Sequence, residues 1–269
     1  MQDTNKNNLP IGVFDSGVGG LSVLRELKRL LPRENFIFFG DQLNVPYGEK
    51  SKQQLVGFLY KITDYLTKNH KVKMLVLACN TATCYAIDEL REKYSFPIVG
   101  TVPALKPAAL KTKTGTIAVI STPATSRSPV IKKLIENYCK GVKVINTGCK
   151  NLENAVEEGE PDSPVAISLL EKYLSPIKNS GADYLVLACT HYPFLKREIK
   201  KIVGPRIKLL DSGKAIARRT DFLLKTGNIK NKQKKVGETY YFTTGDPTKF
   251  SKVASKLLKL KIEAEKVKV

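Results

Sequence analysis

The hydrophobic positions of the chain fall into short apolar runs that alternate with longer segments of helical periodicity. Short runs rich in β-branched and aromatic residues are typical of buried parallel strands, and apolar residues three or four positions apart are typical of amphipathic helices. This alternation predicts an α/β fold with mainly parallel sheets. The expected strands lie at residues 11–15, 36–40, 74–79, 117–121, 142–147, 184–189 and 240–244. The expected helices lie at residues 21–31, 52–68, 82–94, 129–138, 165–181, 193–203 and 246–258.

The pattern also repeats within the chain. Residues 11–28, IGVFDSGVGGLSVLRELK, align with residues 117–134, IAVISTPATSRSPVIKKL. Such self-similarity predicts two similar, pseudo-symmetric α/β domains. We expect the first to be discontinuous, with residues 1–98 and 209–269, and the second to span residues 99–208. The basic stretch 225–238 is expected to be an exposed loop.

Composition places the chain among globular proteins. It has 269 residues, of which 42% are hydrophobic, and no apolar stretch approaches the length of a membrane span. The first ten residues are polar where a signal peptide would be apolar, so a cytoplasmic location is expected. Five cysteines fit a reducing compartment. The absence of a C-x-x-C pair and the presence of only two histidines argue against zinc, and no metal is expected.

The formal net charge of +20 raises the question of a nucleic-acid partner, because basic surfaces bind phosphate backbones. The lysines are spread along the chain, however, and no aromatic-interleaved or helix-turn-helix pattern organises them. Most of them are interpreted as solvated faces. A positive field would equally attract a small anionic substrate, so charge alone does not select the partner.

Two cysteines stand at corresponding places in the two halves. LVLACNTAT at residues 75–83 and LVLACTHYP at residues 185–193 each end an apolar run on a cysteine followed by a hydroxyl or amide residue. A ligand of a parallel α/β sheet binds beyond the carboxyl ends of the strands, and a following helix N-terminus favours a thiolate or an anion. A lone cysteine is usually a core residue, but the duplication favours function for Cys79 and Cys189. Core packing is favoured for Cys84, Cys139 and Cys149.

Other candidates are weaker when taken singly. Residues 14–20, FDSGVGG, form a glycine-rich turn that can bring the backbone close to a ligand, and its Asp15 is either functional or a cap. Residues 46–50, PYGEK, are either a second ligand-binding turn or a simple β-turn. His191 lies two residues after Cys189 and is interpreted as a group that polarises the thiol or supplies a proton, whereas His70 is interpreted as a surface helix end. One carboxylate among Glu153, Glu157, Glu158 and Glu160 could face the site, and spacing does not choose among them.

The motifs DSGVGG, PYGEK, ACNTAT, TPAT and ACTHYP, in this order and spacing, resemble those of the glutamate racemases in the cofactor-independent aspartate/glutamate racemase superfamily. The resemblance runs from about residue 11 to residue 258. It implies an active site in an interdomain cleft, with Cys79 and Cys189 as the catalytic thiols. Asp15 would support the first thiol and His191 the second, and the motif AVEEGE selects Glu157 as the carboxylate near the second. The implied substrate contacts are Asp15, Ser16, Tyr47, Gly48, Asn80, Thr81, Thr122, Thr125, Thr190 and His191.

The resemblance implies an isomerase that interconverts L- and D-glutamate without a cofactor and supplies D-glutamate for peptidoglycan and cell-wall biogenesis. One thiolate would remove the Cα proton and the other thiol would return a proton from the opposite face. A homodimer is also suggested. Two stretches depart from the usual pattern: Ala104 and Leu105 replace a Pro-Gly pair, and GCKNLENA is more polar than its usual counterpart. Two alternatives remain: a racemase acting on aspartate or another amino acid, and a basic module that binds nucleic acid or a regulatory partner.

Overall fold

A computed structural model describes residues 6–269 of the chain as two compact α/β units. The first unit contains the described residues up to Thr101 together with Gly213–Val269, and the second contains Val102–Ser212. Within each unit the described strands pair in parallel throughout, which confirms the predicted fold class. No helix of residues 6–269 is long and apolar enough to cross a bilayer.

The first unit is built on a six-stranded sheet with the order β10-β9-β2-β1-β3-β4. Its strands are β1 (Ile11–Asp15), β2 (Phe36–Gly40), β3 (Met74–Leu77), β4 (Ile98–Gly100), β9 (Thr239–Thr243) and β10 (Ala264–Lys266). The residues of β1, β2 and β3 are all buried, as the apolar runs predicted for strands covered on both faces.

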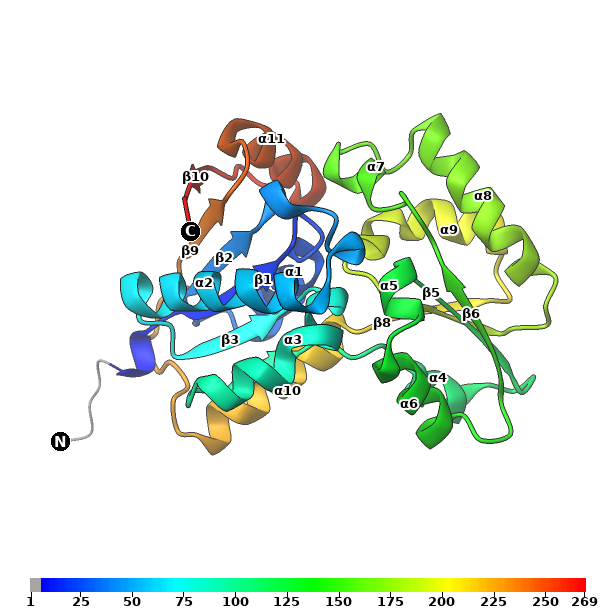
Figure 1. The fold of residues 1–269 in the computed structure, drawn as a ribbon, viewed down its shortest axis with the longest axis horizontal. Coiled ribbons are helices and arrows are strands. Elements are labelled where there is room, and N and C mark those ends of the chain that lie inside the picture. The colour runs from blue at the N-terminus through cyan, green and yellow to red at the C-terminus, as the bar shows by residue number, and fades with distance from the viewer. Residues whose placement is uncertain (1–5) are drawn as a thin grey trace. The chain divides into compact units, whose positions relative to one another are not determined.

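The α-helices of this unit cover the sheet, as Figure 1 shows. They are α1 (Leu21–Leu30), α2 (Lys52–His70), α3 (Asn80–Lys93), α10 (Gly213–Thr226) and α11 (Pro247–Leu258). Helix α2 packs beside α3, and α1 packs against α10 and α11. Local sequence signals fix the helix ends: Ser51 and Gln54 form a capping box before α2, and Asp246 caps α11.

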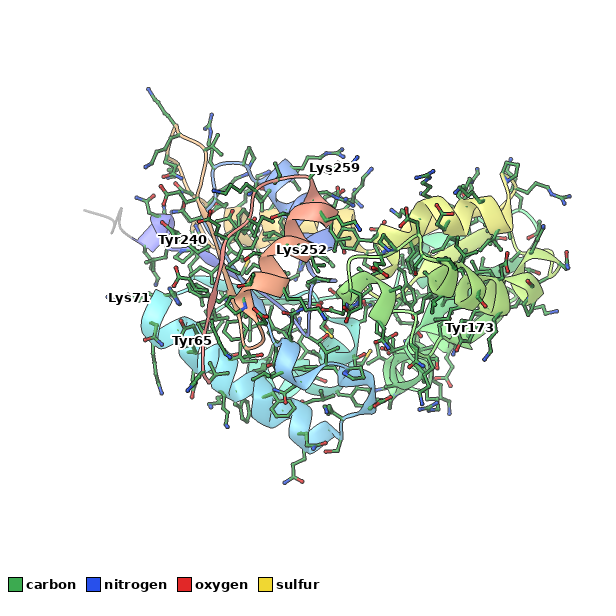
Figure 2. The ribbon with its side chains drawn as sticks, turned by 90° about the horizontal axis from the view of Figure 1, so that it is seen from above. Tyr65, Lys71, Tyr173, Tyr240, Lys252 and Lys259 are labelled. Atoms are coloured by element: carbon green, nitrogen blue, oxygen red, sulfur yellow. The ribbon has the colours of Figure 1, made fainter. Side chains whose placement is uncertain are left out.

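Short 3-10 turns complete the first unit at Lys6–Asn8, Gln42–Asn44 and Tyr47–Glu49. The last turn, η3, carries the PYGEK motif. Figure 2 shows the exposed side chains of Lys252 on α11, of Lys259 just after the end of α11, and of Lys71 just after the end of α2. These lysines are exposed to solvent, as most of the lysines were expected to be.

The second unit has a four-stranded sheet with the order β6-β5-β7-β8. Its strands are β5 (Thr116–Ser121), β6 (Lys143–Gly148), β7 (Tyr184–Leu187) and β8 (Lys208–Asp211). Its helices are α4 (Leu105–Lys111), α5 (Pro123–Ser126), α6 (Pro129–Tyr138), α7 (Asn154–Glu157), α8 (Pro164–Lys178) and α9 (Lys196–Val203), with a 3-10 turn, η4, at Tyr192–Leu195. The stretches that depart from the family pattern form the start of α4 and the segment before α7.

The internal repeat reappears in the strand order. The series β2-β1-β3-β4 in the first sheet matches β6-β5-β7-β8 in the second. The match extends to single hydrogen bonds, because the amide of Ala78 donates to Phe14 and the amide of Ala188 donates to Ile120, each at 2.8 Å. The residues after β3 and β7 are therefore in equivalent positions.

The division of the chain differs in detail from the expected one. A boundary between residues 208 and 209 would cut β8, yet the whole strand pairs with β7 in the second sheet. Likewise β4 begins at Ile98 and pairs with β3, so residues 99 and 100 belong to the first sheet. Sequence periodicity marks strands but does not show which sheet a short strand joins.

The basic stretch 225–238 is largely exposed, as expected, but one part of it is anchored. The backbone amide of buried Asn231 donates to the carboxylate of Glu34 at 2.7 Å. Glu34 also accepts from buried Lys73 at 2.6 Å, and Lys73 donates further to the carbonyl of Ile229 at 2.9 Å. A buried charge pair of this kind is tolerated because its remaining hydrogen bonds are made.

Candidate functional site

Cys79 lies two residues beyond β3 and is the N-cap of α3. Its sulfur accepts from the amide of Ala82 at 3.5 Å, and its thiol lies 3.7 Å from Oγ of Ser16. The side chain is only 6% exposed. The predicted helix N-terminus at this thiol is therefore confirmed, and both it and the amide donor are features that favour negative charge on a sulfur.

Asp15 ends β1 and shapes the glycine-rich turn that follows. The amide of Gly17 donates to its carboxylate at 3.0 Å, and its side chain is fully buried. A Cβ at residue 20 would overlap the Cβ of Asp15, so only glycine allows the first turn of α1 to approach this closely. The turn thus places Asp15 and Ser16 beside the strand that leads to Cys79.

Tyr47 is held in place by contacts within the first unit. Its ring packs against Phe14 and Phe58, with centroids 5.9 and 6.0 Å apart, and its hydroxyl donates to Asp41 at 2.6 Å. Burial raises the pKa of Tyr47 well above its ordinary value, and the Asp41 carboxylate adds to this rise. The phenol is therefore a neutral donor that is hydrogen-bonded to Asp41, and the neighbouring Gly48 is half-buried.

Sequence reasoning missed Asp41. This buried carboxylate also accepts from Asn44 at 2.9 Å and from Thr244 at 2.8 Å, so it ties the PYGEK turn to the end of β9. It directly follows β2, as Asp15 ends β1, and the strand-end rule that singled out Asp15 applies equally here.

Asn80 and Thr81 are the first residues of α3 and are both buried. Among residues 6–269, no group accepts a hydrogen bond from the side-chain amide nitrogen, Nδ2, of Asn80. Buried polar groups are nearly always paired, so an unpaired donor beside Cys79 suits a ligand that brings its own acceptor. We call Asp15, Ser16, Tyr47, Gly48, Cys79, Asn80 and Thr81 the Cys79 half-site.

Cys189 lies two residues beyond β7 but is not followed directly by an α-helix. A turn and η4 come first, and α9 begins only at Lys196. The predicted helix-terminus setting is therefore wrong for this thiol. Its buried sulfur lies 3.5 Å from Nδ1 of His191 instead.

His191 joins Cys189 to a carboxylate. Its other ring nitrogen, Nε2, lies 2.6 Å from Oε1 of Glu157, the last residue of α7. Burial alone would lower the pKa of His191, but the hydrogen bonds to Cys189 and Glu157 outweigh it and hold the pKa well above its ordinary value. Glu157 is thus the glutamate that contacts the histidine, whereas Glu158 and Glu160 are exposed.

Three threonines are the remaining candidate residues of the second unit. Thr122 caps α5, where its hydroxyl accepts from the amide of Thr125 at 3.3 Å and donates to the Thr125 hydroxyl at 3.1 Å. Thr190 is buried next to Cys189. We call Thr122, Thr125, Glu157, Cys189, Thr190 and His191 the Cys189 half-site, and each half-site lies within one unit.

Cys84, Cys139 and Cys149 are placed differently from Cys79 and Cys189. All five cysteines are free thiols. Burial raises the pKa of Cys149 to about 12 and also raises the pKa of Cys139, so neither is a thiolate at neutral pH. Cys84 is half-buried within α3. Over residues 6–269, no cluster of three or more histidine, cysteine or acidic side chains could hold a metal ion.

The chain is similar to known proteins over nearly its whole length. The Asp/Glu/Hydantoin racemase family matches residues 11–220. A glutamate racemase of Herpetosiphon aurantiacus is 43% identical over 91% of this chain and 96% of its own. Among solved structures, a Bacillus anthracis glutamate racemase isoform has a TM-score of 0.87 at 32% identity, covering 98% of both chains. A Francisella tularensis glutamate racemase in complex with D-glutamate has a TM-score of 0.84 at 31% identity, covering 97% of this chain and 98% of its own.

Proposed function

Because the chain belongs to the Asp/Glu/Hydantoin racemase family, we propose that it interconverts L- and D-glutamate with two cysteine thiols and no cofactor. The enzyme is an amino-acid racemase, an isomerase. Relatives that are 37–43% identical over nearly the whole chain are named glutamate racemases, which favours glutamate over aspartate as the substrate. The product, D-glutamate, would serve peptidoglycan synthesis.

The observation that carries this proposal is the equivalence of Cys79 and Cys189 in two sheets of matching strand order. Unless a single base can reach both faces, inverting a stereocentre requires a base on one face of the carbon and an acid on the other. A duplicated unit supplies one thiol to each role, and reversal of the reaction exchanges the roles. The mechanism requires both sulfurs to reach the same Cα from opposite faces.

The substrate Cα proton is very weakly acidic, so its removal needs stabilisation of the charge that develops on the carboxylate. Asn80 supports this step because its buried amide donor has no acceptor among residues 6–269. Thr81 lies two residues after Cys79 and Thr190 lies directly after Cys189, so both would add hydroxyl donors near the substrate. Asp15 would hold the substrate ammonium, and Ser16 would contact the thiol of Cys79.

His191 and Glu157 would act on the Cys189 side. An imidazolium held between Glu157 and Cys189 stabilises the thiolate and offers a proton when the thiol must be restored. In this arrangement Glu157 orients the ring, and its negative charge keeps the ring protonated. A cytoplasmic location, a homodimeric state and the lack of a nucleic-acid partner stay predictions of the sequence.

The test is a racemisation assay without added cofactor. Purified protein is incubated with L-glutamate, D-glutamate or L-aspartate in the presence of EDTA, and the enantiomers are separated by chiral chromatography. We expect both glutamate enantiomers to approach an equal mixture and aspartate to react more slowly, because one methylene is worth about 1–3 kcal/mol of discrimination. If aspartate turns over faster than glutamate, the protein is an aspartate racemase of the same family and the proposed substrate is wrong.

A second readout addresses the two-thiol chemistry. In deuterated water, early product should carry deuterium while recovered substrate does not, because the thiol that takes the proton differs from the one that delivers it. A single base serving both faces would return the original hydrogen to some product. Protiated product at low conversion, measured by mass spectrometry, would contradict the two-thiol mechanism while leaving the racemase activity intact.

A further inference from the structure

Two threonines outside the proposed machinery surround the peptide segment that carries Cys79. Thr83 lies in the first turn of α3, and Thr101 directly follows β4. Both are buried, and both turn toward Leu77, the last residue of β3. Leu77 lies two residues before Cys79, so any contact to its carbonyl acts on the chain that leads into the thiol.

Three hydrogen bonds close this group. The hydroxyls of Thr83 and Thr101 both donate to the carbonyl of Leu77, at 3.3 and 2.9 Å. The amide of Thr101 donates to the hydroxyl of Thr83 at 3.1 Å. A hydroxyl can donate once and accept as well, so Thr83 fulfils both roles at the same time. We call Thr83, Thr101 and the Leu77 carbonyl the threonine clasp.

Packing and the helix backbone support the same arrangement. A Cβ at residue 100 would lie 2.7 Å from Cγ2 of Thr83, so glycine at this position permits the close approach of β4 to α3. The amide of Thr83 also donates to the carbonyl of Cys79 at 3.0 Å. Thr83 is therefore bonded to the chain on both sides of residue 78, through its side chain to Leu77 and through its backbone to Cys79.

The second unit is built differently at the equivalent places. Thr83 lies four residues after Cys79. The residue four positions after Cys189 is Pro193, which has no hydroxyl. Ser212 follows β8 as Thr101 follows β4, and its hydroxyl donates to the carbonyl of Val102 at 2.6 Å. The clasp on the residue that ends the thiol-bearing strand is thus a feature of the Cys79 unit.

We propose that the threonine clasp positions Cys79: it fixes the direction in which α3 leaves β3 and thereby the place of the Cys79 sulfur. Thr83 and Thr101 are positioning residues, because they act through the backbone of residues 77–79 and not on the substrate. The inference rests on the proposed function of Cys79 for its consequence in catalysis. Its geometric content, control of the Cys79 thiol, can be measured without turnover.

The experiment compares Thr83→Val, Thr83→Ser and Thr101→Val in the full chain. The reactivity of each thiol toward iodoacetamide is followed against pH by peptide mass spectrometry, and fragment ions distinguish Cys79 from Cys84. Cys189 is the internal control. Thr63→Val is the matched control variant, because Thr63 is a buried threonine of the same unit whose hydroxyl has no hydrogen-bond partner among residues 6–269.

We expect Thr83→Val to change the alkylation rate of Cys79 by about threefold or more and to leave Cys189 unchanged, since thiol reactivity follows the local environment of the sulfur. The value of kcat/KM should fall roughly tenfold, equally from both enantiomers, because small displacements of a reacting group are costly. Thr83→Ser should restore both quantities. Thr101→Val should show the same changes to a smaller extent, because Thr83 still donates to Leu77, and Thr63→Val should show neither.

Three results would overturn the proposal. A lower melting temperature of Thr83→Val with unchanged Cys79 reactivity and unchanged kcat/KM would assign the clasp to stability alone. Equal changes at Cys79 and Cys189 would indicate general loosening, and a Thr83→Ser variant as impaired as Thr83→Val would exclude the hydroxyl. If Thr83→Val does not fold, Thr101→Val decides between the same outcomes. A wild-type protein without racemase activity, in which Thr83→Val still alters only Cys79, would refute the proposed function and leave the clasp standing.

Discussion

Cys79 and Cys189 occupy equivalent ends of two matching sheets, yet their surroundings are chemically different. Cys79 caps an α-helix and lies near a hydroxyl and a backbone amide. Cys189 contacts an imidazole that is held by a carboxylate. The comparison teaches that the two halves share the place of the thiol but differ in the groups that would favour a thiolate there.

This difference follows from what comes after each cysteine. In the first unit α3 begins at Asn80, so a helix N-terminus is available to the sulfur. In the second unit η4 separates the thiol from α9, which begins at Lys196. Without a helix terminus at this sulfur, a nearby cation can favour the thiolate, and His191 lies where such a cation is needed.

The largest expected effect comes from removing either thiol. Cys79→Ala and Cys189→Ala should each lower kcat/KM for racemisation by about 10³-fold or more, because an acid or a base of the reaction is lost. Each variant should still exchange deuterium from solvent slowly into one enantiomer, and the two variants should label opposite enantiomers. Cys84→Ala, one turn along the same helix, is the control for cysteine loss. Labelling of the same enantiomer by both variants would remove the distinction between the two half-sites.

A smaller effect is expected from His191→Ala, which tests the asymmetry directly. The value of kcat/KM should fall about 10²-fold, the lower end for loss of a group that assists proton transfer. It must fall equally in both directions, because one variant cannot change the equilibrium between enantiomers. The asymmetry should appear in kcat and KM, which should shift together and to different extents from L- and from D-glutamate. Identical shifts of both constants from both enantiomers would count against an exclusive pairing of His191 with Cys189.

The glycine-rich turn offers a matched pair of changes at equivalent positions of the repeat. Gly20→Ala introduces a Cβ that overlaps Asp15 and should destabilise the protein by about 1–3 kcal/mol while lowering activity roughly tenfold. Ser126→Ala, at the aligned position of the second unit, removes only a hydroxyl that donates to Pro123 at 2.9 Å. It should cost about 1 kcal/mol with activity nearly unchanged. Thermal unfolding and kcat/KM measure both, and equal losses would show that the two turns contribute alike.

Much of the fold was predictable because buried parallel strands and amphipathic helices leave strong periodic signals. Helix α6 has the predicted bounds, residues 129–138, and β1 and β2 have theirs. The expected boundary between residues 208 and 209 cuts the short strand β8, because the pairing of β8 with β7 is not visible in the local sequence. Local pattern identifies an element more readily than it identifies its neighbour.

The candidate site shows the same limit at the level of side chains. The helix cap at Cys79 follows from its local sequence, whereas the contact between His191 and Glu157 joins residues 34 positions apart. Spacing alone left several glutamates open, and family resemblance was needed to choose one. Asp41 was missed because its partners Tyr47 and Thr244 meet it only in the folded chain.

The smallest expected effect is a pH dependence of stability that belongs to one half-site only. In the folded protein the pKa of His191 is raised well above its ordinary value, because its bonds to Cys189 and Glu157 outweigh the opposing effect of burial. A raised pKa means that the folded state binds the proton more tightly than the unfolded state, whose histidine titrates near about 6.5. The resulting stabilisation is complete below that pH and is lost as pH rises through the folded pKa.

The wild-type protein should therefore be more stable than His191→Asn by about 1.5 kcal/mol at pH 6, which is a typical contribution of a hydrogen bond to a charged group. This difference in stability should shrink as the pH rises. Melting temperatures of the two proteins from pH 6 to pH 10, followed by circular dichroism, measure it. Thr63→Val supplies the comparison from the first unit, because the Thr63 hydroxyl has no hydrogen-bond partner among residues 6–269, and its difference from wild type should not vary with pH over this range. A difference for His191→Asn that grows with pH would mean that the folded protein holds a neutral imidazole, and the cationic support assigned to Cys189 would then be wrong.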